Sequence, residues 1–243
     1  MAFNVTYKPF GERSILVEWS PVIDEKTLKD ILQFKNSIDK SNIKSIIELK
    51  SAYNSLLISY HTICRNFKNE INVLKKIYSA SHFKVKNTSL LWKIPVCYHV
   101  NFGIDLEAIS IEKKLSTEDI IKRHSQVIYT VYFFGFLPGF LYLGGLDDSI
   151  YVPRKSTPRL QIEKGAVAIG GNQTGVYPES SPGGWNIIGN SPLEFFNPKL
   201  EKPCFAKAGD RIVFKPVSME AYNQIKTLVE GGVYEIESEV FHD

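Results

Sequence analysis

The chain of 243 residues contains few cysteines, and none of them forms a recognisable metal-binding or redox motif. Cys64, Cys97 and Cys204 lie far apart, and no CxxC pair or Cys/His spacing is present. This pattern excludes the disulfide framework of a small secreted protein and predicts buried, reduced thiols. We therefore expect a cytoplasmic protein that carries no metal on this chain.

Common catalytic and nucleotide-binding signatures are also missing. Residues 170–175 (GGNQTG) resemble a phosphate loop only loosely, because the lysine of GxxxxGK[ST] is absent. Ser125 lacks a GxSxG context, and no acid follows His124 closely. Nucleotide binding by this chain alone and a Ser-His-Asp arrangement are therefore not indicated.

The chain has little net charge, but the charge is unevenly distributed. The total of +3 is too small to suggest a nucleic-acid partner. Residues 1–90 hold 14 basic against 8 acidic residues, and residues 91–243 hold 15 against 18. This change in charge composition near residue 90 predicts an N-terminal domain at 1–89 and a second domain at 90–243. The basic surface of the first domain serves either solubility or partner binding.

No membrane-spanning segment is expected. Residues 125–146 are uncharged and long enough to span a bilayer, but Gly135, Pro138 and Gly139 interrupt them and Thr130 suits a strand better. A signal peptide is not expected either, because charged residues interrupt the start of the chain.

The first domain shows the order β-α-β-β-α-β, which is that of a ferredoxin-like fold. The expected elements are a strand at 14–20, a helix at 24–38, strands at 43–49 and 55–60, a helix after Asn66, and a strand at 83–86 or 90–98.

The second domain is expected to be mostly β. Helices at 106–115 and 116–123 come first, the latter opened by a capping box at Ser116. Short segments with Gly and Pro turns then run from 127 to 217, which is typical of a sandwich or barrel. A helix capped by Ser218 and a strand at 233–240 complete an α+β fold.

Residues 165–193 are the most unusual stretch. They hold seven of the 16 glycines and one charged residue, Glu179. Glycine is unfavourable in strands unless backbone or ligand must come close, and uncharged loops seldom face water. We expect this stretch to line either a cleft or a partner interface.

Six residues are candidates for chemistry, and each has a structural alternative. His124, at the end of a helix, is either a proton donor or a cap. Two arginines lie in a segment whose prolines restrict its backbone. Their guanidinium groups either bind an anionic ligand or form structural salt bridges. The side-chain amides of residues 172 and 173 either form hydrogen bonds with an amide substrate or form them with buried backbone groups of the loop. The aromatic residues 177 and 185 are core or cleft walls. The candidates are His124, Arg154, Arg159, Asn172, Gln173 and Tyr177.

Long, ordered motifs resemble a known family. They are GFLPGF at 135–140, YLGGLD at 142–147, TPR at 157–159, VAIGGNQTGVYP at 167–178 and SPGGWNIIG at 181–189. They resemble the allophanate hydrolase subunit 1 family, the carboxyltransferase domain with subdomains C and D, over nearly the whole chain. The resemblance implies a small N-terminal ferredoxin-like α+β domain followed by a cyclophilin-like β-barrel domain.

The resemblance also implies an activity. The family includes the B subunit of bacterial 5-oxoprolinase, which with the A and C subunits opens 5-oxoproline to L-glutamate with ATP. It implies a hydrolase subunit that is inactive alone and shares a cleft with the C subunit, a protein similar to allophanate hydrolase subunit 2. ATP is used by the complex and is not clearly bound by this chain, and neither metal nor biotin is predicted on it. We expect catalytic roles for His124 and Gln173 and substrate binding by Arg154, Arg159, Asn172 and Tyr177, with no nucleophile assigned.

Two other functions remain open at this point. The family also includes KipI, which inhibits the autophosphorylation of a sporulation sensor histidine kinase, so a kinase is a second possible partner. Prolyl isomerase activity is a third possibility, which rests on the resemblance of fold alone.

Overall fold

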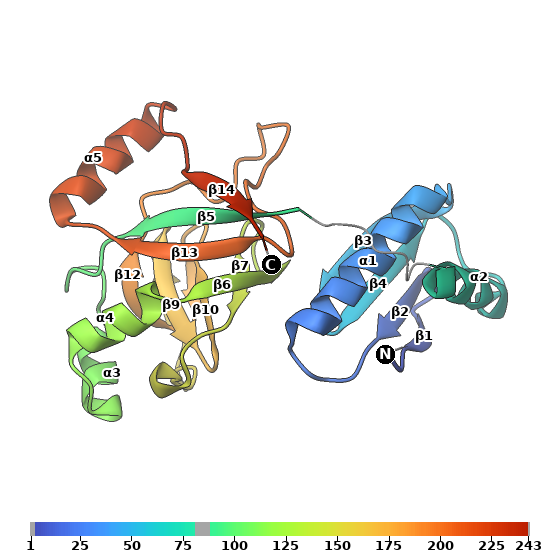
Figure 1. Ribbon diagram of the computed structural model, residues 1–243, viewed down its shortest axis with the longest axis horizontal. Helices are drawn as coiled ribbons and strands as arrows, with labels where there is room; N and C mark the ends of the chain where they lie inside the picture. The colour runs from blue at the N-terminus through green and yellow to red at the C-terminus, as the bar shows by residue number, and fades with distance from the viewer. Residues whose placement is uncertain (1–2, 81–87, 243) are drawn as a thin grey trace. The chain divides into compact units, whose positions relative to one another are not determined.

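The computed structural model describes residues 3–80 and 88–242, which divide into two compact units, Met1–Asn87 and Thr88–Asp243 (Figure 1). The protein is of mixed α and β content, with five α-helices and 14 β-strands in the described residues. None of the helices in these two ranges is long and apolar enough to cross a lipid bilayer. The uncharged stretch that raised that question instead forms strands β6 and β7.

The first unit is a four-stranded antiparallel sheet with two helices. Its strands pair in the order β1-β2-β4-β3. Asp24 begins the first helix by accepting a hydrogen bond from the Thr27 amide, and the apolar side of this helix is buried. The elements are β1 (Thr6–Phe10), β2 (Ser14–Glu18), α1 (Glu25–Ser41), β3 (Ile46–Ala52), β4 (Ser55–Tyr60) and α2 (Phe67–Ala80).

The ferredoxin-like arrangement is not confirmed in this unit. Sequence analysis missed β1, which pairs with β2 at one edge of the sheet. Of the two segments considered for a final strand, residues 90–98 belong to the other unit as β5 (Ser89–Val96), and residues 83–86 lie outside the described residues. The β1–β2 hairpin therefore supplies the edge strand that was expected from the end of the domain.

The second unit is built on an eight-stranded sheet with the order β12-β9-β10-β7-β6-β13-β5-β14. All pairs are antiparallel except β5 with β13. The further elements are α3 (Leu106–Lys113), α4 (Thr117–Ser125), β6 (Ile128–Phe134), β7 (Leu141–Gly144), η1 (Asp148–Ile150), β8 (Arg159–Ile162), β9 (Ala166–Gly170), β10 (Gln173–Val176), β11 (Ser181–Gly183), β12 (Asn186–Asn190), β13 (Arg211–Pro216), α5 (Met219–Glu230) and β14 (Ser238–Phe241).

No closed barrel is found in the described part of this unit. Strands β12 and β14 are the two ends of the sheet order, and β8 pairs separately with β11. A single bridge between Cys97 and Asn190 joins the segment after β5 to the end of β12. The sheet therefore curves back on itself with one point of contact where a barrel would have a full strand pair.

Strand alternation gives the sheet two apolar faces. On β9, Val167 and Ile169 belong to the main core, whereas Ala166 and Ala168 belong to a smaller cluster with Tyr177. Ser116 and Ser218 cap α4 and α5 as predicted. The last strand begins only at Ser238, later than expected. The smaller cluster forms the floor of the candidate site.

Candidate functional site

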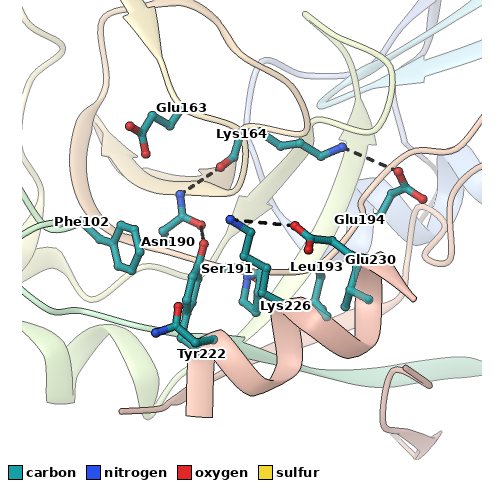
Figure 2. A pocket seen from close by; sticks show the side chains of 13 residues that line it. Phe102, Glu163, Lys164, Asn190, Ser191, Leu193, Glu194, Tyr222, Lys226 and Glu230 are labelled. Carbon is teal, nitrogen blue, oxygen red and sulfur yellow. Dashed lines mark hydrogen bonds and ion pairs between the residues drawn. The ribbon is translucent and has the colours of Figure 1, made fainter. Parts of the chain in front are cut away.

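Two cavities of the second unit differ in their linings. One, of ≈580 Å³, lies against α5 and contains none of the six predicted site residues (Figure 2). We call it the α5 cavity. The other, of ≈330 Å³, is walled by five aromatic rings and contains two of the six. We call it the aromatic pocket; its lining is Phe136, Phe140, Tyr142, Arg154, Lys155, Pro158, Tyr177, Pro182, Gly183, Gly184 and Trp185.

The rings of the aromatic pocket pack edge to face. Phe140 lies 5.2 Å from the Tyr177 ring and 5.5 Å from the Trp185 ring, at interplanar angles of 88° and 86°. Tyr142 lies 6.0 Å from Trp185. Such pairs contribute stability beyond the area they bury. The walls are therefore held together by contacts between their own rings.

Glycines make room for these rings. A Cβ on Gly170 would lie 2.5 Å from the Trp185 ring, and one on Gly183 would lie 2.4 Å from the Tyr177 hydroxyl. Real Cβ atoms do not approach so closely, so only glycine fits at either position. Close approach of aromatic side chains to the backbone thus explains two of the glycines in this stretch, Gly170 and Gly183.

Phe136 stands at the rim of the pocket in a strained conformation. Its φ is +61°, and its side chain is 60% exposed. Its ring meets those of Phe140 and Tyr177 edge-on. A bulky residue at positive φ is uncommon, and such strain is concentrated at functional sites.

Arg154 brings positive charge to the aromatic pocket. Its guanidinium lies 5.5 Å from the centre of the Trp185 ring, a cation–π distance. Its charge acts against the burial that raises the pKa of both Tyr142 and Tyr177. The Asn186 amide donates to the Pro153 carbonyl at 2.9 Å, which fixes the segment that carries Arg154. Arg154 and Tyr177 are the two predicted residues that the structure brings together.

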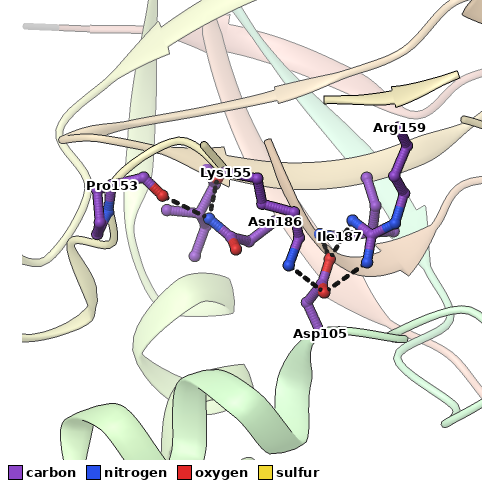
Figure 3. A network of polar contacts seen from close by, with 7 residues as sticks. Asp105, Pro153, Lys155, Arg159, Asn186 and Ile187 are labelled. Atoms are coloured by element: carbon purple, nitrogen blue, oxygen red, sulfur yellow. Dashed lines mark hydrogen bonds and ion pairs between the residues drawn. The ribbon is translucent and has the colours of Figure 1, made fainter. Parts of the chain in front are cut away.

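A buried carboxylate anchors the next part of the same segment (Figure 3). Asp105 is 3% exposed. It accepts two hydrogen bonds from the Arg159 guanidinium, at 2.8 and 2.7 Å, and one from the Ile187 amide at 2.7 Å. Lys155 Nζ lies 2.8 Å from Asp105 Oδ1. The Arg159 fork is therefore engaged in a salt bridge, the structural alternative for this residue.

The electrostatics of Asp105 follow from these contacts. Burial raises the pKa of its carboxyl, but hydrogen bonds from Arg159, Lys155 and the Ile187 amide outweigh burial, so the pKa lies below its usual value. Asp105 precedes α3, where an aspartate ordinarily caps the helix, but its side chain makes no capping bond. Its carboxylate is directed to the network instead.

His124 lies away from both cavities, in the main core. Its Nε2 lies 2.8 Å from Thr174 Oγ1, and its Nδ1 lies 2.7 Å from the Tyr98 hydroxyl. Thr174 donates its own proton to the Ala168 carbonyl, so it accepts from Nε2–H, and Nδ1 accepts from Tyr98. Burial lowers the pKa of His124 to about 3. This neutral, fully bonded imidazole suits a positioning role and does not support proton donation.

The two predicted amides lie on the β9–β10 hairpin. Asn172 is exposed in its turn and lines neither cavity. Gln173 opens β10, and by strand alternation it shares a sheet face with Gly175, where an added Cβ would lie 3.1 Å from the Phe140 ring. The Gln173 Nε2 atom is buried, with no hydrogen-bond partner among the described residues. A hairpin also does not fit a nucleotide-phosphate loop, which would precede a helix.

Comparison with known proteins identifies the family. The sequence model of one protein family, described as the carboxyltransferase domain, subdomain C and D, matches residues 5–206 of this chain. The chain belongs to this family. The resemblance noted in the sequence motifs is thereby confirmed.

Two relatives of this chain are similar to it over most of their length. It is 32% identical to the B subunit of 5-oxoprolinase from Bacillus subtilis (strain 168), over 93% of this chain and 98% of the relative. It is 32% identical to the B subunit of 5-oxoprolinase from Escherichia coli O157:H7, over 85% of this chain and 93% of the relative.

A solved structure shows the same fold. The Kluyveromyces lactis urea carboxylase matches with a TM-score of 0.82 at 20% identity, covering 99% of this chain and 24% of that much longer one.

Sequence reasoning on this family member missed two residues that shape the site. Asp105 and Lys155 meet across 50 positions of the chain, and neither stands in a pattern that signals the contact. Trp185 was considered as either a core residue or a cleft wall, and it is both, being 4% exposed and lining the pocket. The only signal available was the density of glycine and aromatic residues around the pocket.

Proposed function

We propose that this chain is the B subunit of a 5-oxoprolinase complex, which opens 5-oxoproline to L-glutamate with ATP together with the A and C subunits. The observation that carries the proposal is the 32% identity to the B subunit of a 5-oxoprolinase along almost the full length of both chains. Partner subunits follow from the same proposal, with the C subunit sharing the cleft. ATP is then bound outside this chain.

The aromatic pocket suits the substrate class. A volume of ≈330 Å³ is at the lower end of small-molecule sites, which fits a small ring. Aromatic walls accept the faces of a flat lactam, and Arg154 attracts the carboxylate that this lactam carries. Arg154 lies against Trp185, whereas Lys155 and Arg159 are both paired with Asp105.

Within this proposal the chain binds and orients rather than transfers protons. The aromatic pocket is lined by rings, prolines, glycines and two cations. Binding energy that positions a reactant can supply much of a rate enhancement. The protein is therefore expected to be inactive alone, and the catalytic role predicted for Gln173 is not part of the proposal, because Gln173 does not line the pocket.

Reconstitution tests the proposal. The chain is combined with the A and C subunits from the same source, and glutamate release from 5-oxoproline is measured with and without ATP. Arg154→Ala should raise KM by roughly ten- to a hundred-fold, the cost of losing a hydrogen bond to a charged group. The control is Arg123→Ala, since Arg123 contacts Asp147 and Ser149 outside the pocket.

The outcomes separate site from function. If the complex is active and the Arg154→Ala variant keeps its full kcat and an unchanged KM, the substrate does not bind in the aromatic pocket. A complex with no ATP-dependent glutamate release would reject the activity itself. Recovery of a histidine kinase as the stoichiometric partner would support the inhibitor function instead.

A further inference from the structure

The α5 cavity is separate from the aromatic pocket and has its own wall. The two cavities share no lining residue. One wall is helix α5, which lies beyond residues 5–206 that the family model matches. The opposite wall is formed by the end of β12 and the turn before β9 (Figure 2). A ligand held there would contact α5, which lies outside the matched residues, and an opposite wall that lies within them.

Ser191 lines this cavity, and its side-chain hydroxyl is buried without a partner in the part of the chain that the structure describes. Ser191 is 2% exposed, and its Oγ has no hydrogen-bond partner within the described residues. Its backbone amide is satisfied, since it donates to the Gly165 carbonyl at 2.8 Å. An unsatisfied buried hydroxyl carries a free-energy cost, which a polar ligand atom would relieve.

The wall around Ser191 is preformed. The Tyr222 hydroxyl donates to Asn190 Oδ1 at 2.9 Å, and Asn190 Nδ2 donates to the Lys164 carbonyl at 2.9 Å. The rings of Phe102 and Tyr222 lie 4.6 Å apart. These contacts attach α5 to the sheet and leave an apolar surface that a small side chain can cover.

Each wall carries charges of both signs. On α5, Lys226 lies 3.9 Å from Glu230, and on the opposite wall Lys164 lies 3.6 Å from Glu194 (Figure 2). All four side chains are between 43% and 67% exposed. Exposed pairs of this kind contribute little to stability, so a ligand can recruit their charges at low cost.

We propose that the α5 cavity binds a short peptide with free termini and an apolar side chain. Its ammonium and carboxylate groups would meet the opposite charges on the two walls, its backbone would bond to the Ser191 hydroxyl, and its side chain would cover Phe102 and Tyr222. A volume of ≈580 Å³ is within the range of ligand sites and larger than a single amino acid requires.

Calorimetric titration of the full chain with the tripeptide alanyl-leucyl-alanine tests this inference. Saturable binding is expected, with Kd below about 1 mM. The matched control is the same tripeptide with acetylated and amidated ends, which keeps the side chains and loses both charges. It should bind at least about tenfold more weakly. Free leucine, which spans less of the cavity, should also bind more weakly than the tripeptide.

Two variants locate the binding. Ser191→Ala should weaken binding about fivefold while thermal stability stays equal or rises, because no folded-state partner is lost. Lys226→Glu should weaken binding, whereas Lys76→Glu, an exposed change in the other unit, should not. The inference is overturned if no peptide saturates, if the capped and free peptides bind equally, or if Ser191→Ala lowers stability and leaves affinity unchanged.

Discussion

Two networks in the second unit remove a titratable side chain from water, and they do so in opposite ways. Asp105 is held by Arg159, Lys155 and a backbone amide, so that its charge is matched. His124 is held by two neutral hydroxyls, Tyr98 and Thr174. The first network fixes the loop beside the aromatic pocket, and the second ties α4 to strand β10 in the core.

The same direction of pKa shift therefore has opposite consequences. A lowered pKa keeps Asp105 ionised, because cations outweigh the burial that opposes its charge. A lowered pKa keeps His124 neutral, because burial disfavours its charged form and its two partners are neutral hydroxyls. A buried titratable group is therefore neutral unless groups of opposite charge contact it. The contacting groups decide whether it is an ion or a neutral hydrogen-bonding group.

The largest effect is expected from Asp105→Ala. The change leaves Arg159 and Lys155 without their anion and the Ile187 amide without an acceptor, so the free energy of unfolding should fall by about 3–5 kcal/mol. Urea unfolding measures it. The control is Glu179→Gln, which removes an exposed partner of Lys164 and should cost less than about 1 kcal/mol. Equal losses in both variants would show that the buried network does not stabilise the fold more than an exposed ion pair does.

Breaking the neutral network should cost less. Thr174→Val keeps the shape and removes the hydroxyl that accepts from His124 and donates to Ala168, so stability should fall by about 1–3 kcal/mol. Thr117→Val is the control, because the side chain of the half-buried Thr117 at the start of α4 bonds, among the described residues, only to the neighbouring Glu118, and it should change stability by less than about 0.5 kcal/mol. If the two variants unfold alike in urea, the hydrogen-bond chain has no energetic role.

The pH dependence of stability distinguishes the networks directly. The folded pKa of His124 is about 3, against about 6.5 when unfolded, so below pH 6.5 only the unfolded chain binds its proton. His124 should contribute a loss of stability of about 1.4 kcal/mol per pH unit as pH falls from 6.5 toward 3.

The lowered pKa of Asp105 acts in a different window. The stability from Asp105 is complete above its unfolded pKa of about 3.9 and is lost below it. Unfolding between pH 6.5 and 5 therefore isolates His124. His124→Phe should flatten the dependence in that window, and an unchanged slope in this variant would contradict the buried, neutral assignment.

The smallest effect is expected from Lys155→Met. Arg159 keeps both of its hydrogen bonds to Asp105 and the Ile187 amide keeps its own, so the loss should stay below about 1 kcal/mol. Arg159→Met is the comparison, and it should cost more because it removes the two-pronged contact. A loss from Lys155→Met as large as that from Asp105→Ala would show that both cations are required.

Local sequence patterns correctly predicted the helices that begin with a capping residue. The capping residues Asn66, Ser116 and Ser218 begin helices as expected. Strand β1 was missed because Thr6–Phe10 ends in Pro-Phe and is exposed over most of its length, so its apolar pattern is weak. The expected strand at 90–98 exists, but its pairing with β13 lies more than 110 positions away and no local pattern encodes it.

The sequence by itself determined the family, the mixed α and β content and the concentration of glycine and aromatic residues at one site. These follow from ordered motifs and from short-range rules of capping, alternation and turn chemistry. Only the tertiary structure decided that Arg154 faces the pocket while Arg159 serves Asp105, and that His124 is a neutral core residue. The physical reason is that charge and reactivity depend on burial and on partners that lie 50 or more positions away in the chain.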